Sequence, residues 1–258
     1  MGIMSKVLSW RDSDCGEKSH LNVSQHHHIA QTIVISISLL FFLVFLPSSI
    51  RTALLRGLHE HQYITSMLIC LGLLALSLLW TTGQSIDAWV FSYFNLRGKH
   101  PLWLDWIMLG FTQIGNGFFA LLVALVLFST NLQRLAYELI LGTLTLWLLV
   151  EVFKAIVHRS RPFIRVAGAR IVGPRERGCS FPSGHTSQVF FMATLLYQYF
   201  HPHFWVAFSL FALAVLVAVT RMYVGAHYPR DVLAGFILGS VWSILGVIVD
   251  THFLIAIR

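Results

Sequence analysis

Several long stretches of this sequence contain no charged side chain. Residues 29–50, 63–86 and 106–133 contain no Asp, Glu, Lys or Arg. A helix that crosses the hydrocarbon core of a bilayer needs about 20 mostly apolar residues. Of the 258 residues, 56% are hydrophobic and 11% are charged, whereas a soluble domain carries about 25% charged residues. The chain is therefore predicted to be an integral membrane protein.

Seven apolar runs predict an all-α fold, a polytopic transmembrane helix bundle. The runs cover residues 29–50, 63–86, 106–133, 139–150, 186–200, 204–220 and 232–249. Because the connecting segments are too short to fold independently, the bundle forms one domain behind an N-terminal tail of residues 1–28. In the last run, Gly235 and Gly239 form a GxxxG pattern, which favours close helix packing. We expect unpaired thiols at the three scattered cysteines, Cys15, Cys70 and Cys179.

The net charge is positive, and its location matters more than its size. Lys and Arg number 18 and Asp and Glu 11, which gives +7 with histidine neutral. Loops beside a membrane commonly carry such an excess. The bilayer is the expected partner and nucleic acid is not, because no segment outside the apolar runs is long enough for a nucleic-acid-binding domain. The longest internal loop, residues 158–182, carries arginines at positions 159, 161, 165, 170, 175 and 177.

A first polar motif lies where the run 139–150 ends. Lys154 and Arg161 are seven positions apart, close to two helical turns, so both cations can project to one side. Pro162 disfavours helical geometry at the residue before it, so Arg161 should leave the helix. The simpler alternative for Lys154 is an ion pair with Glu151 one turn earlier.

A second motif, Pro182-Ser183-Gly184-His185, stands directly in front of the run 186–200. Ser183 suits a helix N-cap, and the first backbone N–H groups of a helix are unsatisfied donors. Such a terminus, opened by a glycine, can bind an anion. His185 adds a proton that can be transferred. The alternative is a plain serine cap followed by an interfacial histidine.

A third motif joins the last two apolar runs. His227 and Asp231 are four positions apart, and Pro229 between them fits the first turn of a helix. A carboxylate at that spacing can accept a hydrogen bond from an imidazole and set its tautomer, which leaves the other nitrogen as a nucleophile or base. Arg221 supplies a bidentate donor for phosphate oxygens. The alternative is a structural His–Asp cap.

The three motifs meet at helix ends on one membrane face, because helices that alternate in direction place loops 158–182 and 221–231 on the same side. Cations, a helix N-terminus and two imidazoles form a site for a tetrahedral anion. No set of residues predicts a metal site, and we expect no cofactor. Such a site supports phosphoryl transfer, in which His227 attacks phosphorus, His185 protonates the leaving oxygen and the cations hold the equatorial charge.

The order Lys-x6-Arg-Pro, Pro-Ser-Gly-His and Arg-x5-His-x3-Asp resembles the type 2 phosphatidic acid phosphatase (PAP2) family of integral membrane lipid phosphatases, and every motif position matches. The resemblance covers residues 63–254 and implies a six-helix core, to which the helix 29–50 is an addition. It implies a metal-independent phosphatase with His227 as nucleophile, Asp231 as its partner and His185 as acid. It also implies the phosphate ligands Lys154, Arg161, Ser183, Gly184 and Arg221.

The expected substrate is a lipid phosphomonoester or diphosphate that reaches the site by lateral diffusion. Family association favours an isoprenyl diphosphate such as undecaprenyl diphosphate, with phosphatidylglycerophosphate and phosphatidic acid as alternatives. A lipid-to-lipid phosphotransferase would use the same residues. A transporter or channel would need polar side chains at mid-membrane, whereas here they cluster at helix ends.

The distribution of basic residues predicts which side of the inner membrane carries the site. Arg51, Arg56, Arg134 and Arg258 would lie on the face opposite the three motifs. Because cytoplasmic loops are enriched in Lys and Arg, we expect that face to be cytoplasmic and the site to be extracytoplasmic.

Overall fold

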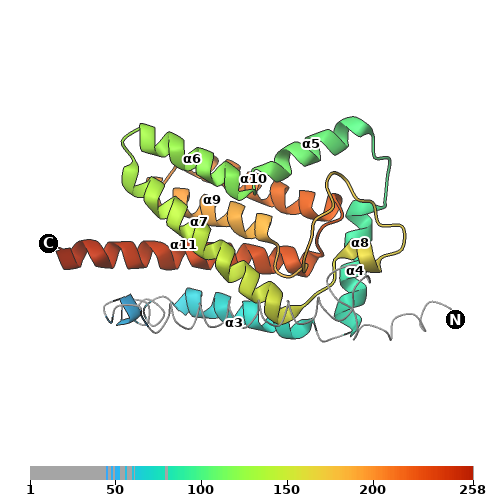
Figure 1. The fold of residues 1–258 in the computed structure, drawn as a ribbon, viewed down its shortest axis with the longest axis horizontal. Coiled ribbons are helices and arrows are strands. Elements are labelled where there is room, and N and C mark those ends of the chain that lie inside the picture. Colours follow the sequence, from blue (N-terminus) through green and yellow to red (C-terminus); the bar gives the residue numbers. More distant parts are fainter. Residues whose placement is uncertain are drawn as a thin grey trace, which may run out of the picture.

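The computed structural model describes residues 62–78 and 81–257, together with isolated positions between 45 and 60. This part of the chain is helical and contains no strand, so the all-α prediction is confirmed. The helices, shown in Figure 1, are α3 (Gln62–Ser77), α4 (Thr81–Asn95), α5 (Leu102–Gln113), α6 (Gly117–Ser129), α7 (Gln133–Val157), α8 (Pro162–Arg165), α9 (Gly184–Phe200), α10 (Phe204–Tyr223) and α11 (Pro229–Ile257).

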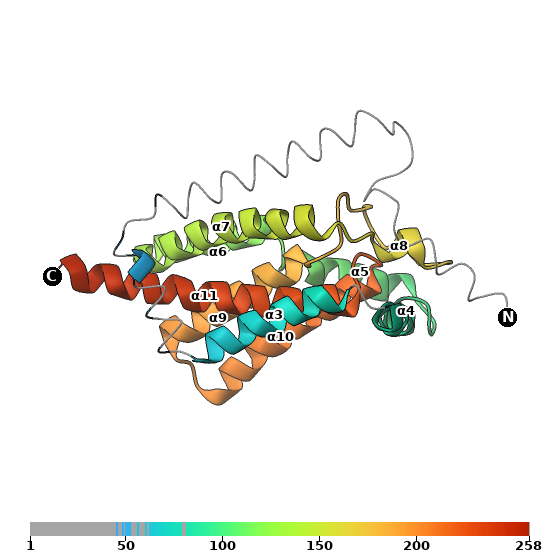
Figure 2. The same ribbon diagram turned by 90° about the horizontal axis from the view of Figure 1, so that it is seen from below.

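Helix α9 forms the centre of the bundle. Every residue from position 186 to 195 is buried, and α7, α10 and α11 pack around it (Figures 1 and 2). A helix that is buried on all sides belongs to the core of a bundle. The Pro-Ser-Gly-His motif therefore opens a helix whose residues 186–195 are enclosed by its neighbours.

Two glycines of α11 allow it to lie directly against α9. A Cβ atom on Gly239 would lie 2.1 Å from the carbonyl oxygen of Ser187, and one on Gly235 would lie 2.7 Å from that of Ser183. Side chains larger than hydrogen cannot fit at such a contact between backbones. The packing role predicted for the GxxxG pattern is confirmed.

The expected continuous helices over residues 63–86 and 106–133 are wrong. The axes of α3 and α4 differ by 97°, and those of α5 and α6 differ by 57°. At the second break the side chain of Asn116 accepts a hydrogen bond from the Phe118 N–H of α6 at 3.2 Å. A Cβ atom on Gly115 would lie 2.7 Å from the backbone oxygen of His185, so the break brings α5 and α6 against the start of α9.

The molecule is an integral membrane protein. Among the described residues, the segments Gln133–Arg165, Phe204–Tyr223 and Pro229–Asp250 are long and apolar enough to cross a bilayer, and this part of the chain has up to five spans if each bent pair counts as one. The expected tail 1–28 lies outside the described residues, and only a few positions of the expected helix 29–50 are described. The count of seven helices therefore stays a prediction. Cys70 is a free thiol, but Cys179 is disulfide-bonded, so the expectation of an unpaired thiol is wrong there.

The long connection between α8 and α9 is anchored by Asn95, at the end of α4. Its side-chain amide donates to the carbonyl oxygens of Arg170 at 3.0 Å and Tyr223 at 2.7 Å, and its amide oxygen accepts from the Arg170 N–H at 2.7 Å. The Arg170 guanidinium also forms an ion pair with Asp105 of α5 at 2.8 Å. These contacts tie the loop to three helices, so its residues 171–178 lie over the ends of α9 and α10.

Candidate active site

Four helix ends meet at one end of the bundle. They are the C-termini of α7 and α10 and the N-termini of α9 and α11 (Figure 1). A cavity of about 480 Å³ opens there. Its lining includes the predicted site residues Lys154, Arg161, Gly184, His185 and His227. The structure thus brings together residues that are separated by up to 73 positions in the sequence.

His227 lies in the turn between α10 and α11 and is 1% exposed. Its Nδ1 atom is 2.7 Å from the carbonyl oxygen of Ser180. Because a carbonyl oxygen can only accept, Nδ1 carries the proton and Nε2 keeps its lone pair. Nε2 lies 3.3 Å from Nη1 of Arg161, which can only donate. Burial of the ring, together with the nearby charges of Arg161 and Arg221, lowers the pKa of His227 to about 3.

Asp231, in the first turn of α11, is fully buried. Its carboxylate accepts hydrogen bonds from the Tyr228 N–H at 2.9 Å, from Nη1 of Arg159 at 2.5 Å and from the Ser180 hydroxyl. The His227 Nδ1 atom is 3.8 Å away. The expected direct hydrogen bond between Asp231 and His227 is therefore absent. Ser180 connects the two residues instead, because its hydroxyl binds the carboxylate and its carbonyl binds the imidazole.

Arg161 and Arg221 supply two buried guanidinium groups, each 2% exposed. Arg161 has extended backbone angles (φ −73°, ψ 155°) directly before Pro162, as the sequence predicts. Its guanidinium donates to the carbonyl oxygens of Arg177, Gly178 and Ala226. Arg221, in the last turn of α10, donates to the Thr112 hydroxyl of α5 at 2.5 Å.

At the start of α9, the predicted residues behave differently from one another. Gly184 and His185 line the cavity. Ser183 occupies the N-cap position but makes no side-chain capping bond, and its buried hydroxyl accepts from the Thr186 hydroxyl at 2.9 Å. Ser183 does not line the cavity, so any contact of its hydroxyl with phosphate requires a change of rotamer.

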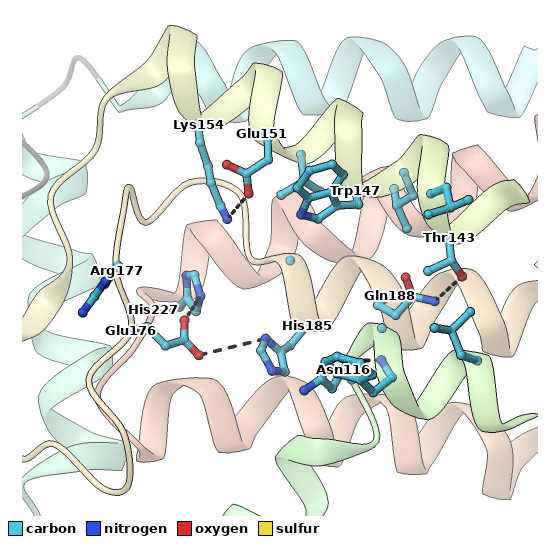
Figure 3. Close-up of a pocket in the computed structure, with 18 of the residues that line it drawn as sticks. Asn116, Thr143, Trp147, Glu151, Lys154, Glu176, Arg177, His185, Gln188 and His227 are labelled. Carbon is cyan, nitrogen blue, oxygen red and sulfur yellow. Dashed lines mark hydrogen bonds and ion pairs between the residues drawn. The ribbon is translucent and has the colours of Figure 1, made fainter. Parts of the chain in front are cut away.

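Lys154 lies in the last turn of α7 and lines the cavity. Its Nζ atom forms an ion pair with Glu151 at 2.8 Å (Figure 3). The simpler alternative for Lys154 is thus present in the structure. It does not remove the residue from the site, because Lys154 and Glu151 both face the same space.

Glu176, from the loop between α8 and α9, is a site residue that the motifs do not predict. Its carboxylate forms ion pairs with Arg161 at 2.8 Å and with Arg221. It also lies 3.7 Å from Nε2 of His227 and 4.0 Å from Nδ1 of His185. Figure 3 shows the carboxylate between the two imidazoles. A loop has no periodicity that would predict where such a side chain points.

Arg159 was missed as well. Its guanidinium binds Asp231 on one side and Gln84 and Asp87 of α4 on the other. It also lies 4.2 Å from the ring centre of Tyr228. One signal was available in the sequence, because Asp87 follows an uncharged run and ionisable groups near membrane segments are costly unless paired.

Comparison with known proteins identifies the family. The profile described as "PAP2 superfamily" matches residues 135–253, which include all three motifs. The undecaprenyl-diphosphatase of Sulfolobus acidocaldarius is 33% identical over 128 residues, which cover 50% of this chain and 61% of the relative. The phosphatidylglycerophosphatase B of Bacillus subtilis is 30% identical over 151 residues, 53% of this chain and 70% of the relative.

A shorter match to another lipid phosphatase also falls in this family. The lipid A 1-phosphatase of Rhizobium johnstonii is 47% identical over 72 residues, 27% of this chain and 28% of the relative. The chain thus spans less than two thirds of the length of some curated relatives that it matches.

The crystal structure of a transmembrane PAP2 type phosphatidylglycerolphosphate phosphatase from Bacillus subtilis superposes with a TM-score of 0.64 at 26% identity, over 76% of this chain and 97% of that chain. That of Aquifex aeolicus LpxE superposes with a TM-score of 0.57 at 28% identity, over 63% of this chain and 94% of that chain. From its motifs, its helical bundle and these matches, the chain belongs to the PAP2 superfamily.

Proposed function

We propose that this protein is a metal-independent membrane phosphatase that hydrolyses a lipid phosphomonoester or diphosphate. The observation that carries the proposal is the composition of one cavity. Its lining combines Lys154, Arg161, His185 and His227 with a set of apolar side chains. Those apolar residues, which are exposed and so face the hydrocarbon of a bilayer, are Phe118, Leu121, Leu144 and Trp147. A lipid tail can lie there while its terminal phosphate reaches the cations.

The reaction begins with attack of His227 Nε2 on the terminal phosphorus. A phosphorus–nitrogen bond forms as the bond to the leaving oxygen breaks, and His185 gives that oxygen a proton. The guanidinium groups of Arg161 and Arg221, with Lys154 and the N–H groups at Gly184, hold the charge on the three remaining oxygens. Water, deprotonated by His185, then attacks the phosphohistidine and releases inorganic phosphate.

Asp231 acts on this reaction through Ser180. The serine carbonyl keeps the proton on Nδ1 of His227, so Nε2 stays available as nucleophile. When Nε2 bonds to phosphorus the ring becomes cationic, and the buried carboxylate 3.8 Å from Nδ1 stabilises that charge.

Among lipid phosphates we favour an isoprenyl diphosphate such as undecaprenyl diphosphate. The support is the relative named undecaprenyl-diphosphatase, which is 33% identical. Phosphatidylglycerophosphate and phosphatidic acid are the alternatives, and the first is supported by the relative named phosphatidylglycerophosphatase B. Transfer to a second lipid in place of water would use the same residues.

The experiment is a substrate panel with purified protein in detergent, in the presence of EDTA. Undecaprenyl diphosphate, phosphatidylglycerophosphate, phosphatidic acid and lipid A are compared by release of inorganic phosphate. We expect release with EDTA present, inhibition by vanadate and the highest kcat/KM for the isoprenyl diphosphate. His227→Ala should abolish turnover while the protein still binds phosphate. Turnover by that variant, or dependence on added metal, would contradict the proposal.

A further inference from the structure

We propose that Glu176 is a specificity-determining residue that occupies the phosphate site and must be displaced by the substrate. The inference rests on the proposed function, because it takes the arginine pair to be the phosphate site. Its consequence is that anions of low charge, such as the phosphodiester groups of ordinary membrane lipids, do not enter.

The Glu176 carboxylate makes the contacts that a phosphate group would make. Its two oxygens bind different guanidinium groups, Oε2 that of Arg161 at 2.8 Å and Oε1 that of Arg221. Arginine pairs with carboxylate and phosphate oxygens in the same forked geometry. The carboxylate also lies 3.7 Å from the nucleophilic Nε2 of His227, where phosphorus must come to react.

An anion between Arg161 and Arg221 compensates their buried charges. Both guanidinium groups are nearly inaccessible, and among the residues that the structure describes Glu176 is the carboxylate that forms ion pairs with them. Their other hydrogen-bond partners are neutral oxygens and the His227 ring. Because a buried cation without a counter-charge is costly, Glu176 stabilises the site when substrate is absent.

Space is present for the carboxylate to leave. A second cavity of about 230 Å³ adjoins the first, and Glu176, Asn116 and His185 line both. Arg175 and Gln113 also line the second cavity and offer polar partners there. Rotation of the Glu176 side chain from one cavity to the other leaves the anchor of the loop at Asn95 intact.

Because the incoming anion must displace the Glu176 carboxylate, the site favours anions that carry more than one negative charge. A terminal phosphomonoester carries about −1.5 to −2 charges at neutral pH, more than the single charge of the carboxylate that it replaces. A phosphodiester carries a single charge and offers no electrostatic gain over Glu176. An enzyme surrounded by phosphodiester lipids therefore keeps its anion site free for terminal phosphates and diphosphates.

The test measures binding separately from turnover, with the full chain in detergent micelles. Inorganic phosphate is titrated calorimetrically into the wild type, Glu176→Gln and Glu138→Gln. The last variant removes an equal charge from an ion pair with Arg134, at the other end of α7. We expect Glu176→Gln to bind phosphate about tenfold more tightly, the ratio for one charge-assisted hydrogen bond that no longer competes. Glu138→Gln should bind as the wild type does.

A second measurement tests selectivity, with phosphatidylglycerol, a singly charged phosphodiester, as inhibitor of lipid phosphate hydrolysis. It should inhibit Glu176→Gln at least about tenfold more strongly than the wild type. If Glu176→Gln does not fold, Glu176→Asp keeps the charge but withdraws the carboxylate by one methylene, and a smaller gain in the same direction is expected.

Equal phosphate affinity in the wild type and the Glu176 variants would overturn the inference, as would an equal gain in Glu138→Gln or no phosphate binding by any of them. A gain in phosphate affinity without release of phosphate from any lipid would instead leave the role of Glu176 standing and refute the proposed function.

Discussion

At the scale of single residues, the chemistry of the site depends on how His227 is held. Its spacing to Asp231 suggested the direct pairing that occurs when both residues lie on one helix. Helix α11 begins at Pro229, so His227 lies in the preceding turn and its ring meets the Ser180 carbonyl first. The proton still stays on Nδ1, because the carbonyl and the carboxylate both favour it there.

The enclosed environment of His227 predicts that the ring stays neutral in mildly acidic solution. Because burial lowers its pKa to about 3 from an ordinary 6.5, NMR of histidine-labelled protein should show no titration of this ring between pH 8 and about 5. The spectrum of the same protein in about 8 M urea, in which the ring is exposed, serves as the control. The His227→Asn variant assigns the signal, and a midpoint near 6.5 for that signal would contradict the prediction.

The sign of the effect on stability follows from the same pKa difference. An unfolded chain binds a proton at this imidazole below about 6.5, whereas the folded chain does not until about 3. The contribution of His227 to folding free energy is therefore fully present above pH 6.5 and is lost as the pH falls from 6.5 towards 3.

At the scale of helices, the site depends on how closely α9 and α11 approach. Helix α9 carries Gly184 and His185 at its start, and α11 begins two residues after His227 and carries Asp231 in its first turn. Glycines in α11 permit contact between the two backbones. A small separation of these helices would move the two imidazoles apart without changing any site residue.

Gly239→Ala should lower the stability of the bundle. The added Cβ would lie 2.1 Å from the Ser187 carbonyl oxygen, a backbone atom that cannot rotate away. We expect a loss of about 1–3 kcal/mol, the usual cost of forcing an extra methyl into a packed core. Gly246→Ala on the same helix is the matched control, since its Cβ would meet nothing within 4 Å. Thermal unfolding in detergent measures both, and equal melting temperatures would contradict the prediction.

At the scale of the whole molecule, the two ends of the bundle carry different charged groups, and the cavity lies at one of them. The cavity and its buried charges lie at one end, with the start of α11, whereas Arg134 of α7 pairs with Glu138 and Asp250 near the other end of α7 and α11. We propose that the cavity end is extracytoplasmic and the Arg134 end cytoplasmic, in agreement with the positive-inside rule.

Labelling with a membrane-impermeant maleimide tests this orientation. Lys99, between α4 and α5, and Gln133, at the start of α7, are both exposed. In right-side-out inner-membrane vesicles, Lys99→Cys should be labelled above the level of the parent chain and Gln133→Cys should not. Inverted vesicles should give the opposite result. The reversed pattern in the two preparations would place the site in the cytoplasm.

The class of fold and most of the site residues could be predicted from the sequence, because both depend on local signals. Uncharged runs predict membrane helices, Pro162 predicts the extended Arg161, and helix-end motifs predict which side chains gather. The bend after α3 escaped prediction because apolar residues continue through it in the sequence. At the bend after α5, Gly115-Asn116-Gly117 is a turn signal within an uncharged run, but the contact of Gly115 with His185 that fits the bend is visible only in the fold.

The partners of the buried charges could not be predicted from the sequence, because they lie far apart along the chain. Glu176 lies 45 positions from Arg221, and Arg159 lies 72 from both Asp87 and Asp231. Such pairs form because low-dielectric surroundings force each buried charge to find a counter-charge wherever the packed helices and loops bring one. No periodicity in the sequence predicts these pairs, since they depend on the path of the loop between α8 and α9 through space.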